Sequence, residues 1–225
     1  MKFSYTIIST LLSVLSFQFT FSQINASWTN TGPVNFPPDI SGQINGIGRV
    51  SQLKFHPTNS QIMFAASASG GLYKSNDNGT TWAQTGTDKL PYGLSTASIC
   101  IDLTNDQVLY LGTGDANYYG SRDYGIWKSM DGGTSWMPSC AGIGNRVALE
   151  ILMNPADHNV LLAATDDGIW KSTNAGVNWT LKSVSDQFTD MDFKPGTNGQ
   201  TIYAASYNYF YRSQDGGETW TKISN

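Results

Sequence analysis

The sequence predicts an all-β chain built from repeated units of four short strands. A turn that starts with serine recurs at Ser75, Ser129, Ser172 and Ser213. The 225 residues include 23 glycines and 12% aromatic residues but only 13% charged residues, against about 25% in ordinary domains. Units of roughly 40 to 50 residues with four strands have the size of propeller blades. The fold expected is therefore a β-propeller, with about four blades present as part of a larger ring.

Residues 1–22 have the pattern of a secretory signal peptide. Lys2 precedes an apolar stretch that ends in small or polar residues, with Thr20 and Ser22 suitably placed before a cleavage site. An uncleaved membrane anchor is the alternative, but the stretch contains several hydroxyl side chains and is short for a bilayer span. We expect a secreted or cell-surface protein without a membrane span after cleavage.

Residues 23–48 form an N-terminal segment that holds one strand similar to the last of the four strands in each repeated unit. Its sequence SWTNTG, at residues 27–32, copies TWAQTG at residues 81–86. The strand lacks partner strands of its own, and the last unit already carries its own exit strand. This pattern predicts the front part of a longer propeller, with further blades of the same protein as partners.

Four units follow, at residues 49–96, 97–145, 146–187 and 188–225. Each opens with an alternating segment, turns into an apolar run of small residues, and continues through a short aromatic strand. The serine turn and an exit strand, which starts at a tryptophan, complete the unit. This order places the first hairpin turns and the serine turns on one side, and the second hairpin loops on the other. Ligands are expected on the side of the second hairpin loops.

The serine turn is interpreted as a structural staple. Its acid can accept hydrogen bonds from the turn's own N–H groups, and its glycine permits a left-handed backbone. Burying the tryptophan contributes about 4 to 6 kcal/mol as an upper estimate, against about 1 to 2 kcal/mol for the hydrogen bonds. A calcium loop needs more oxygen ligands than one carboxylate per turn. The staple residues are Ser75, Asp77, Gly79, Trp82, Ser129, Asp131, Gly133, Trp136, Ser172, Asn174, Gly176, Trp179, Ser213, Asp215, Gly217 and Trp220.

The pattern Ser-x-Asp-x-Gly-x-Thr-Trp resembles the Asp-box, or bacterial neuraminidase repeat, and the resemblance covers residues 49–220. Families that share this motif include sialidases, xyloglucan-cleaving glycosidases and the sortilin-type receptor domain, all of which are propellers of six or more blades. The sequences around GRVSQLKFHPTN and GIWKSMDGGTSW are most similar to those of exported bacterial proteins described as sortilin-like or glycosidase-like. The resemblance implies that four blades form an incomplete ring.

The catalytic residues that the resemblance implies are incomplete in this chain. A sialidase would need an Arg-Ile-Pro segment, which is absent, and a tyrosine activated by glutamate. The glutamates are Glu150 and Glu218, and Glu218 lies in a serine turn. Xyloglucan-cleaving enzymes carry a catalytic aspartate before the Gly-Gly of the first blade, where this chain has Ser69. A two-carboxylate mechanism therefore lacks one member here.

The candidate ligand site combines one long loop with two arginines. The second hairpin loop of the second unit, within residues 112–125, gathers Asp115, Asn117, Tyr118, Tyr119, Arg122 and Asp123. Aromatic rings beside carboxylates and amides suit a sugar ring or an extended peptide, although an ordinary surface loop is the alternative. Arg49 and Arg146 start two inner strands and could bind a carboxylate, with salt bridges or solvated strand ends as the alternative.

Composition excludes some functions. The net charge of -4, the pI near 5.0 and the lack of a basic cluster argue against nucleic-acid binding. His56 and His158 lie in different units without a Cys/His cluster, so no metal or other cofactor is expected. Export would permit a disulfide between Cys100 and Cys140, with two separate thiols as the alternative.

The sequence supports three functional hypotheses. The first is a recognition module for a glycan or an extracellular protein or peptide, without a complete active site. The second is a glycoside hydrolase that uses Asp115 or Asp123 as its acid and takes other catalytic residues from further blades. The third is a purely structural adhesion segment.

Overall fold

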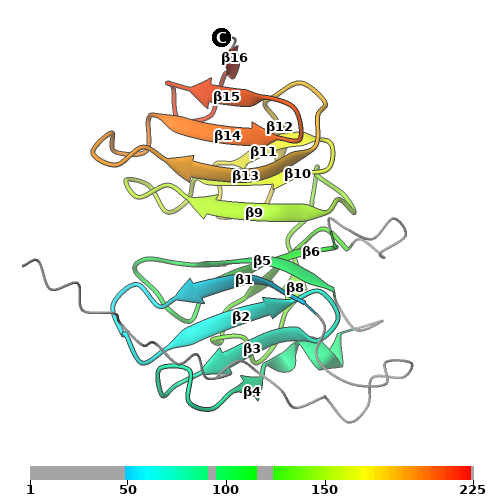
Figure 1. Ribbon diagram of the computed structural model, residues 1–225, viewed down its shortest axis with the longest axis vertical. Coiled ribbons are helices and arrows are strands. Elements are labelled where there is room, and N and C mark those ends of the chain that lie inside the picture. Colours follow the sequence, from blue (N-terminus) through cyan, green and yellow to red (C-terminus); the bar gives the residue numbers. More distant parts are fainter. Residues whose placement is uncertain (1–48, 91–94, 116–123, 224–225) are drawn as a thin grey trace, which may run out of the picture. The chain divides into compact units, whose positions relative to one another are not determined.

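The computed structural model describes residues 49–90, 95–115 and 124–223, which belong to the unit formed by residues 31–225. The predicted signal peptide and the segment at residues 23–48 lie outside the described residues. Four four-stranded antiparallel sheets make up the structure (Figure 1), each with its strands in sequence order. Within the described ranges, no helix is long and apolar enough to cross a membrane.

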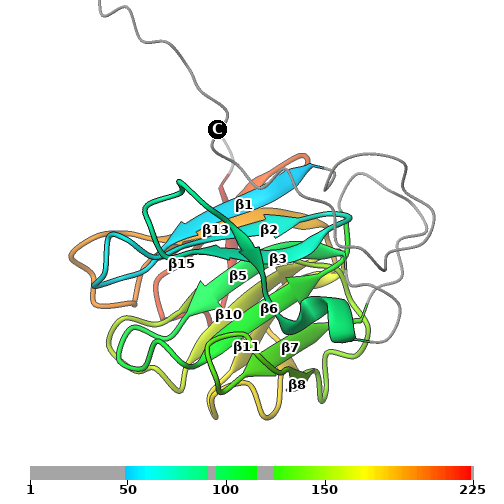
Figure 2. The same ribbon diagram turned by 90° about the horizontal axis from the view of Figure 1, so that it is seen from below.

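Sheets I and II come from the first half of the described chain. Sheet I contains β1 (Val50–Phe55), β2 (Met63–Ser67), β3 (Gly71–Ser75) and β4 (Ala83–Gln84). Sheet II contains β5 (Thr96–Ile101), β6 (Leu109–Thr113), β7 (Ile126–Ser129) and β8 (Met137–Pro138). The 3-10 helix η1 (Gly86–Lys89) connects them (Figure 2) and contacts β3 of sheet I. Its Gly86 N–H donates to the Gly133 carbonyl of sheet II at 2.8 Å.

Sheets III and IV repeat the same plan. Sheet III contains β9 (Ala148–Met153), β10 (Leu161–Thr165), β11 (Gly168–Ser172) and β12 (Thr180–Leu181). Sheet IV contains β13 (Phe188–Phe193), β14 (Ile202–Ser206), β15 (Phe210–Ser213) and β16 (Thr221–Ile223). All pairs of neighbouring strands are antiparallel hairpins, as the turn signals in the sequence predict.

The first strand of each sheet makes the main contacts between sheets. Strand β5 packs on β1 and β2, β9 packs on β5 and β6, and β13 packs on β9 and β10. In Figure 1, β9 accordingly lies between β5 and β13. Strands β2, β5, β6 and β10 are buried along their whole length, because both of their faces are covered. This explains why β2, β6 and β10 have continuous apolar sequences of small residues, whereas β5, which the sequence predicts as an alternating segment, is also buried on both faces.

Each junction between neighbouring sheets holds its own apolar core. Phe64 and Leu72 of sheet I pack with Ile99 and Leu111 of sheet II. The second core joins sheets II and III and includes both Tyr110 and Ile151, while the third joins sheets III and IV. Both cysteines are free thiols, and Cys100 is buried in the second core. The structure therefore has the separate-thiol arrangement rather than the disulfide.

The four serine turns, at residues 75–82, 129–136, 172–179 and 213–220, are called turns I to IV. In each, the serine Oγ accepts the N–H of the fifth residue, a glycine with positive φ, at 2.8 to 2.9 Å. The fourth residue of each turn donates its N–H to the first hairpin turn of the same sheet. These bonds are Asn78 to Gln61, Gly132 to Gln107, Ala175 to Asn159 and Gly216 to Gln200. Serine turns and first hairpin turns therefore lie on the same side of each sheet.

The third residue of each turn accepts hydrogen bonds from the turn itself. The Asp131 carboxylate accepts from the Ser135 N–H at 2.8 Å, the Ser135 hydroxyl at 2.6 Å and the Ser129 hydroxyl at 2.8 Å. These bonds, led by the Ser135 hydroxyl, lower the pKa of Asp131 to about 2. Asn174 takes the same position in turn III and accepts the Asn178 N–H at 2.9 Å with its single oxygen.

The turn tryptophans pack toward the preceding sheet. Trp136 joins the core between sheets I and II, and Trp179 joins the core between sheets II and III. Trp136 Nε1 donates to the Gly133 carbonyl at 3.1 Å, whereas Trp179 Nε1 donates across the junction to the Ser139 carbonyl at 2.7 Å. Trp82 and Trp220 are only partly buried. The inner turns are therefore the more firmly packed ones.

Candidate functional site

A pocket of about 220 Å³ opens where the first strands of all four sheets begin. Its lining includes the second residue of each of the strands β1, β5, β9 and β13, namely Ser51, Ala97, Leu149 and Thr189. Because strands β1 and β2 and their counterparts are antiparallel, this end is also where the second hairpin loops leave. We call it the loop-side pocket.

The charged pair in the loop-side pocket is Arg49 with Asp115. The Arg49 guanidinium, directly before β1, forms an ion pair with the Asp115 carboxylate that follows β6. The Arg49 side chain is about half exposed, so part of it stays open to solvent. The pair joins sheets I and II across the pocket and places a planar cation with several N–H donors beside it.

Hydroxyl groups brace the rim of the loop-side pocket. The Ser95 hydroxyl lies 2.6 Å from the Ala68 carbonyl and 3.1 Å from the Gly114 carbonyl, so it joins sheets I and II. The Ser51 hydroxyl donates to the Thr96 carbonyl at 2.6 Å. Gly114 has a φ of +109°, and a Cβ on it would lie 2.7 Å from the Val147 side chain. The chain at Asp115 is thus fixed by its backbone as well as by Arg49.

Arg146 lies outside the lining of the loop-side pocket. It forms an ion pair of 2.7 Å with Asp167, which belongs to the second hairpin loop of the same sheet. The two arginines therefore do not form a joint clamp in this structure. Each is held by a carboxylate, which is the salt-bridge alternative that the sequence left open.

The loop residues Asn117, Tyr118, Tyr119, Arg122 and Asp123 lie outside the described residues. The two ends of their loop are fixed by one side chain. The Thr113 hydroxyl donates to the Gly125 carbonyl at 2.7 Å, and the Tyr124 N–H donates back to the Thr113 Oγ1 at 3.0 Å. This anchor holds the two described ends of the loop together, close to Asp115.

A second polar cluster, which the sequence did not single out, surrounds Glu150 in β9. The Gln52 amide of β1 donates to the Glu150 carboxylate and accepts the Ile99 N–H of β5 at 2.7 Å. Lys54 Nζ lies 3.5 Å from Glu150. Burial raises the Glu150 pKa to about 7, although Lys54 opposes that rise. The sequence signal is a glutamate inside an otherwise apolar inner strand.

Glu218 has no part in the loop-side pocket. It lies in turn IV, where Lys171 Nζ and Lys182 Nζ each approach its carboxylate at 2.7 Å. Hydrogen bonds from Lys171 first, and from Lys182, lower its pKa. The carboxylate therefore serves the contact between sheets III and IV.

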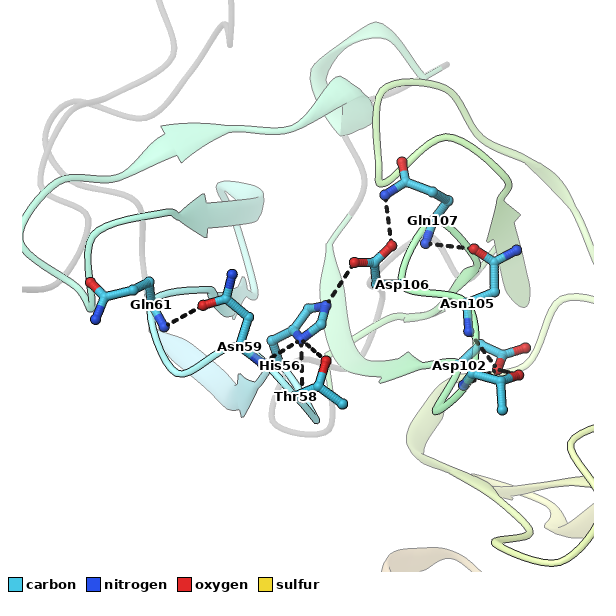
Figure 3. Close-up of polar contacts among 9 residues, drawn as sticks. His56, Thr58, Asn59, Gln61, Asp102, Asn105, Asp106 and Gln107 are labelled. Carbon is cyan, nitrogen blue, oxygen red and sulfur yellow. Dashed lines mark hydrogen bonds and ion pairs between the residues drawn. The ribbon is translucent and has the colours of Figure 1, made fainter.

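The two histidines join first hairpin turns on the opposite side of the molecule's sheets. Figure 3 shows His56 reaching Asp106, with 3.1 Å between Nε2 and the carboxylate. Its Nδ1 accepts the Thr58 and Asn59 N–H groups at 3.2 and 3.0 Å. His158 uses its other ring nitrogen: Nδ1 lies 3.3 Å from the Asp102 carboxylate and 3.0 Å from the Thr104 hydroxyl. Among the described residues, no three His, Cys, Asp or Glu side chains gather as metal ligands.

A larger pocket, about 380 Å³, lies elsewhere, between sheet I and turn II. Lys74, Gln84, Lys89, Gln107 and Gly132 contribute to its lining. It is an open groove formed by two sheets on the serine-turn side. We place the candidate site at the smaller loop-side pocket because all four sheets converge there and because ligand sites favour such convergent positions.

Comparisons with known proteins identify the fold. No family model and no curated protein matches this sequence. The structure is similar to a GH74 enzyme from Niastella koreensis, with 27% identity, a TM-score of 0.60, and coverage of 79% of this chain and 30% of that chain. A GH74 xyloglucanase from Xanthomonas campestris gives 20% identity, a TM-score of 0.60, and coverage of 79% and 31%. An auxiliary nutrient binding protein from Bacteroides thetaiotaomicron gives 15% identity, a TM-score of 0.58, and coverage of 80% and 43%.

These similarities, with the four antiparallel sheets, confirm that the chain is a partial β-propeller. The chain spans less than a third of the length of the two GH74 chains and less than half of the nutrient binding protein. Each described sheet is one blade.

Proposed function

We propose that this chain is part of an exported Asp-box propeller that recognises a glycan at the loop-side pocket. The observation that carries the proposal is the convergence of all four blades on this pocket, with the Arg49–Asp115 pair at its rim. Guanidinium and carboxylate groups provide directional donors and acceptors for sugar hydroxyls. Tyr118 and Tyr119 of the adjoining loop would supply stacking surfaces for the sugar ring.

The Asp-box reading is supported by the repetition of one turn geometry in all four blades. Every turn uses its serine, its acid or amide and its glycine in the same hydrogen bonds. A device that is needed at each blade serves assembly, so the ligand is expected away from it. The similarity to a nutrient binding protein and to GH74 enzymes adds to the case for a glycan.

A GH74-like glycoside hydrolase is the second candidate, and the likeness to two GH74 enzymes favours it. The usual mechanism needs two carboxyl groups within about 5 to 10 Å of each other. Asp115 is the carboxylate in the lining of the loop-side pocket, and Arg49 already pairs with it. The second carboxyl group that this mechanism requires is not in the pocket's lining among the described residues. Recognition is therefore the better-supported function of the described residues.

Binding is tested by calorimetric titration of xyloglucan oligosaccharides and by a glycan and peptide array. The Arg49→Met variant should bind the glycan about tenfold more weakly, because one charged hydrogen bond is lost. Arg146→Met is the matched control and should bind as the wild type does, since Arg146 does not line the pocket. Equal binding by all three proteins would contradict the site. Peptide binding without glycan binding would reassign it to a protein ligand.

The loop is tested separately with a Tyr118→Ala/Tyr119→Ala variant on the same array. Loss of glycan signals supports stacking by these rings, and unchanged signals would exclude the loop.

The hydrolase alternative predicts release of reducing sugar from xyloglucan, with that release abolished in Asp115→Asn. Export predicts a mature N-terminus near Ser22 in the exported protein, which N-terminal sequencing measures.

A further inference from the structure

The residue before each serine turn is basic, and it pairs across strands with a large residue of the second strand. The four cross-strand pairs are Lys74 with Phe64, Lys128 with Tyr110, Lys171 with Leu162 and Arg212 with Tyr203. In sheets I to III these pairs lie on the face that packs against the next sheet. The same position thus recurs four times, once on a face that no described sheet covers.

The junction between sheets II and III shows what this pair does. Lys128 Nζ lies 5.0 Å from the centre of the Tyr110 ring and donates to the Ala175 carbonyl at 3.1 Å. The Tyr110 hydroxyl donates to the same carbonyl at 3.0 Å. Ala175 is the fourth residue of turn III. The pair therefore captures the serine turn of the following sheet.

The junction between sheets III and IV uses the same contact. Lys171 Nζ donates to the carbonyl of Gly216, the fourth residue of turn IV, at 2.8 Å. At the junction between sheets I and II, Lys74 lies 5.5 Å from the centre of the Phe64 ring. It shares a pocket lining there with Gly132, the fourth residue of turn II. The basic residue thus bonds to the next turn at two junctions and shares a pocket lining with that turn at the third.

Sheet IV presents this arrangement without an occupant among the described residues. Tyr203 is 40% exposed, whereas Tyr110 at the matching position is 1% exposed. Phe210, at 65%, and Ile223, at 42%, lie on the same face. The Arg212 guanidinium forms no hydrogen bond or ion pair within residues 49–90, 95–115 and 124–223, although the Arg212 backbone lies in the sheet. An apolar surface that surrounds an unpaired guanidinium is typical of an interface.

We infer that this face, made by Tyr203, Phe210, Arg212 and Ile223, binds a further four-stranded sheet that carries the same serine turn. Arg212 donates to the carbonyl of the fourth residue of that turn, and the Tyr203 ring lies beneath the contact. The occupant follows from the three junctions within the chain, where equivalent faces receive such a turn. The guanidinium has more donors than the ammonium of Lys128 or Lys171, so it can also bind a second acceptor in the incoming turn.

The test extends the whole chain by a copy of residues 184–225 after Asn225. Six residues then join β16 to the added first strand, as residues 182–187 join β12 to β13. Hydrogen exchange at β14 and β15 should slow in the extended protein. Arg212→Met in the original sheet IV should reduce that added protection about tenfold or more, because a charged hydrogen bond is lost. The same substitution should leave exchange in the unextended chain unchanged.

Lys89→Met is the matched control, because Lys89 is an exposed basic residue of η1, far from sheet IV in the sequence. It should leave the added protection intact. Equal exchange in the extended protein with and without Arg212 would overturn the inference. An Arg212-dependent dimer of the unextended chain, measured by sedimentation, would also overturn it and assign the face to a second copy. A Tyr203→Phe variant that keeps the added protection would support the role of the ring itself.

Discussion

Glu150, a buried carboxyl group in strand β9, has a strongly shifted pKa. Burial raises its pKa from the ordinary 4.5 to about 7, against the attraction of Lys54. A carboxyl with a higher pKa in the folded state binds protons more tightly when folded. Its contribution to stability is thus complete below about pH 4.5 and is lost as the pH rises through about 7. The difference corresponds to about 3 kcal/mol.

We predict that Glu150→Gln removes this pH dependence. The free energy of unfolding of the wild type, minus that of the variant, should fall by up to about 3 kcal/mol between pH 4.5 and pH 8. Urea unfolding at several pH values measures it. Glu218→Gln serves as a control of opposite sign, because Lys171 and Lys182 lower the Glu218 pKa. Its contribution is present above the ordinary pKa and lost as the pH falls. A pH-independent difference for Glu150→Gln would contradict the prediction.

Asp131 is predicted to tolerate an amide but not a methyl group. Asn174 shows that a single amide oxygen still accepts both the Ser172 hydroxyl and the Asn178 N–H. Asp131→Asn should therefore lower the melting temperature slightly, because only the bond from the Ser135 hydroxyl to the second oxygen is weakened. Asp131→Ala should lower it further, since the Ser135 N–H loses its acceptor as well. A similar melting temperature for the two variants would refute the hydrogen-bonding role.

At the scale of the element, the turn tryptophans differ in what they hold together. Trp136 is buried between sheets I and II, and Trp136→Ala should cost about 3 to 5 kcal/mol of unfolding free energy. Trp220 is only partly buried, and its Nε1 has no hydrogen-bond partner among the described residues. Trp220→Ala should therefore cost less than half as much. Denaturant unfolding compares them, and an equal cost would show that burial does not set the effect.

The elements themselves follow closely from local sequence. Alternating and small apolar segments, with glycine or asparagine at the turns, predict the sixteen strands of the described residues and their antiparallel order. Cross-sheet contacts do not follow from local sequence. Arg49 lies 66 residues from Asp115, and Gln52 lies 98 residues from Glu150. Such pairs depend on how the sheets are rotated about one another, which the strand pattern does not encode. The candidate site therefore remains a prediction, and the pairing of Arg49 with Asp115 did not follow from the sequence.

At the scale of the whole molecule, each described sheet packs mainly on its neighbours in the chain's order, as in other repeat proteins, although Gln52 and Lys54 of sheet I also reach Glu150 of sheet III. Stability is then a sum of sheet and junction contributions. A substitution at the junction between sheets III and IV should therefore destabilise sheet IV more than the distant sheet I. The buried Lys171 ammonium is suited to test this, because it joins β11 to both Gly216 and Glu218 of turn IV.

We predict that Lys171→Met lowers the hydrogen-exchange protection of β14 and β15 by about tenfold or more, and that of β2 and β3 far less. The expected loss of about 1.5 to 3 kcal/mol is that of a charged hydrogen bond. Methionine keeps the volume of the lysine stem, so a cavity does not account for the change. Lys194→Met, at an exposed position after β13, is the control and should leave both regions unchanged. Uniform loss of protection over all four sheets would mean that the sheets unfold as one cooperative unit, and the nearest-neighbour description would then fail.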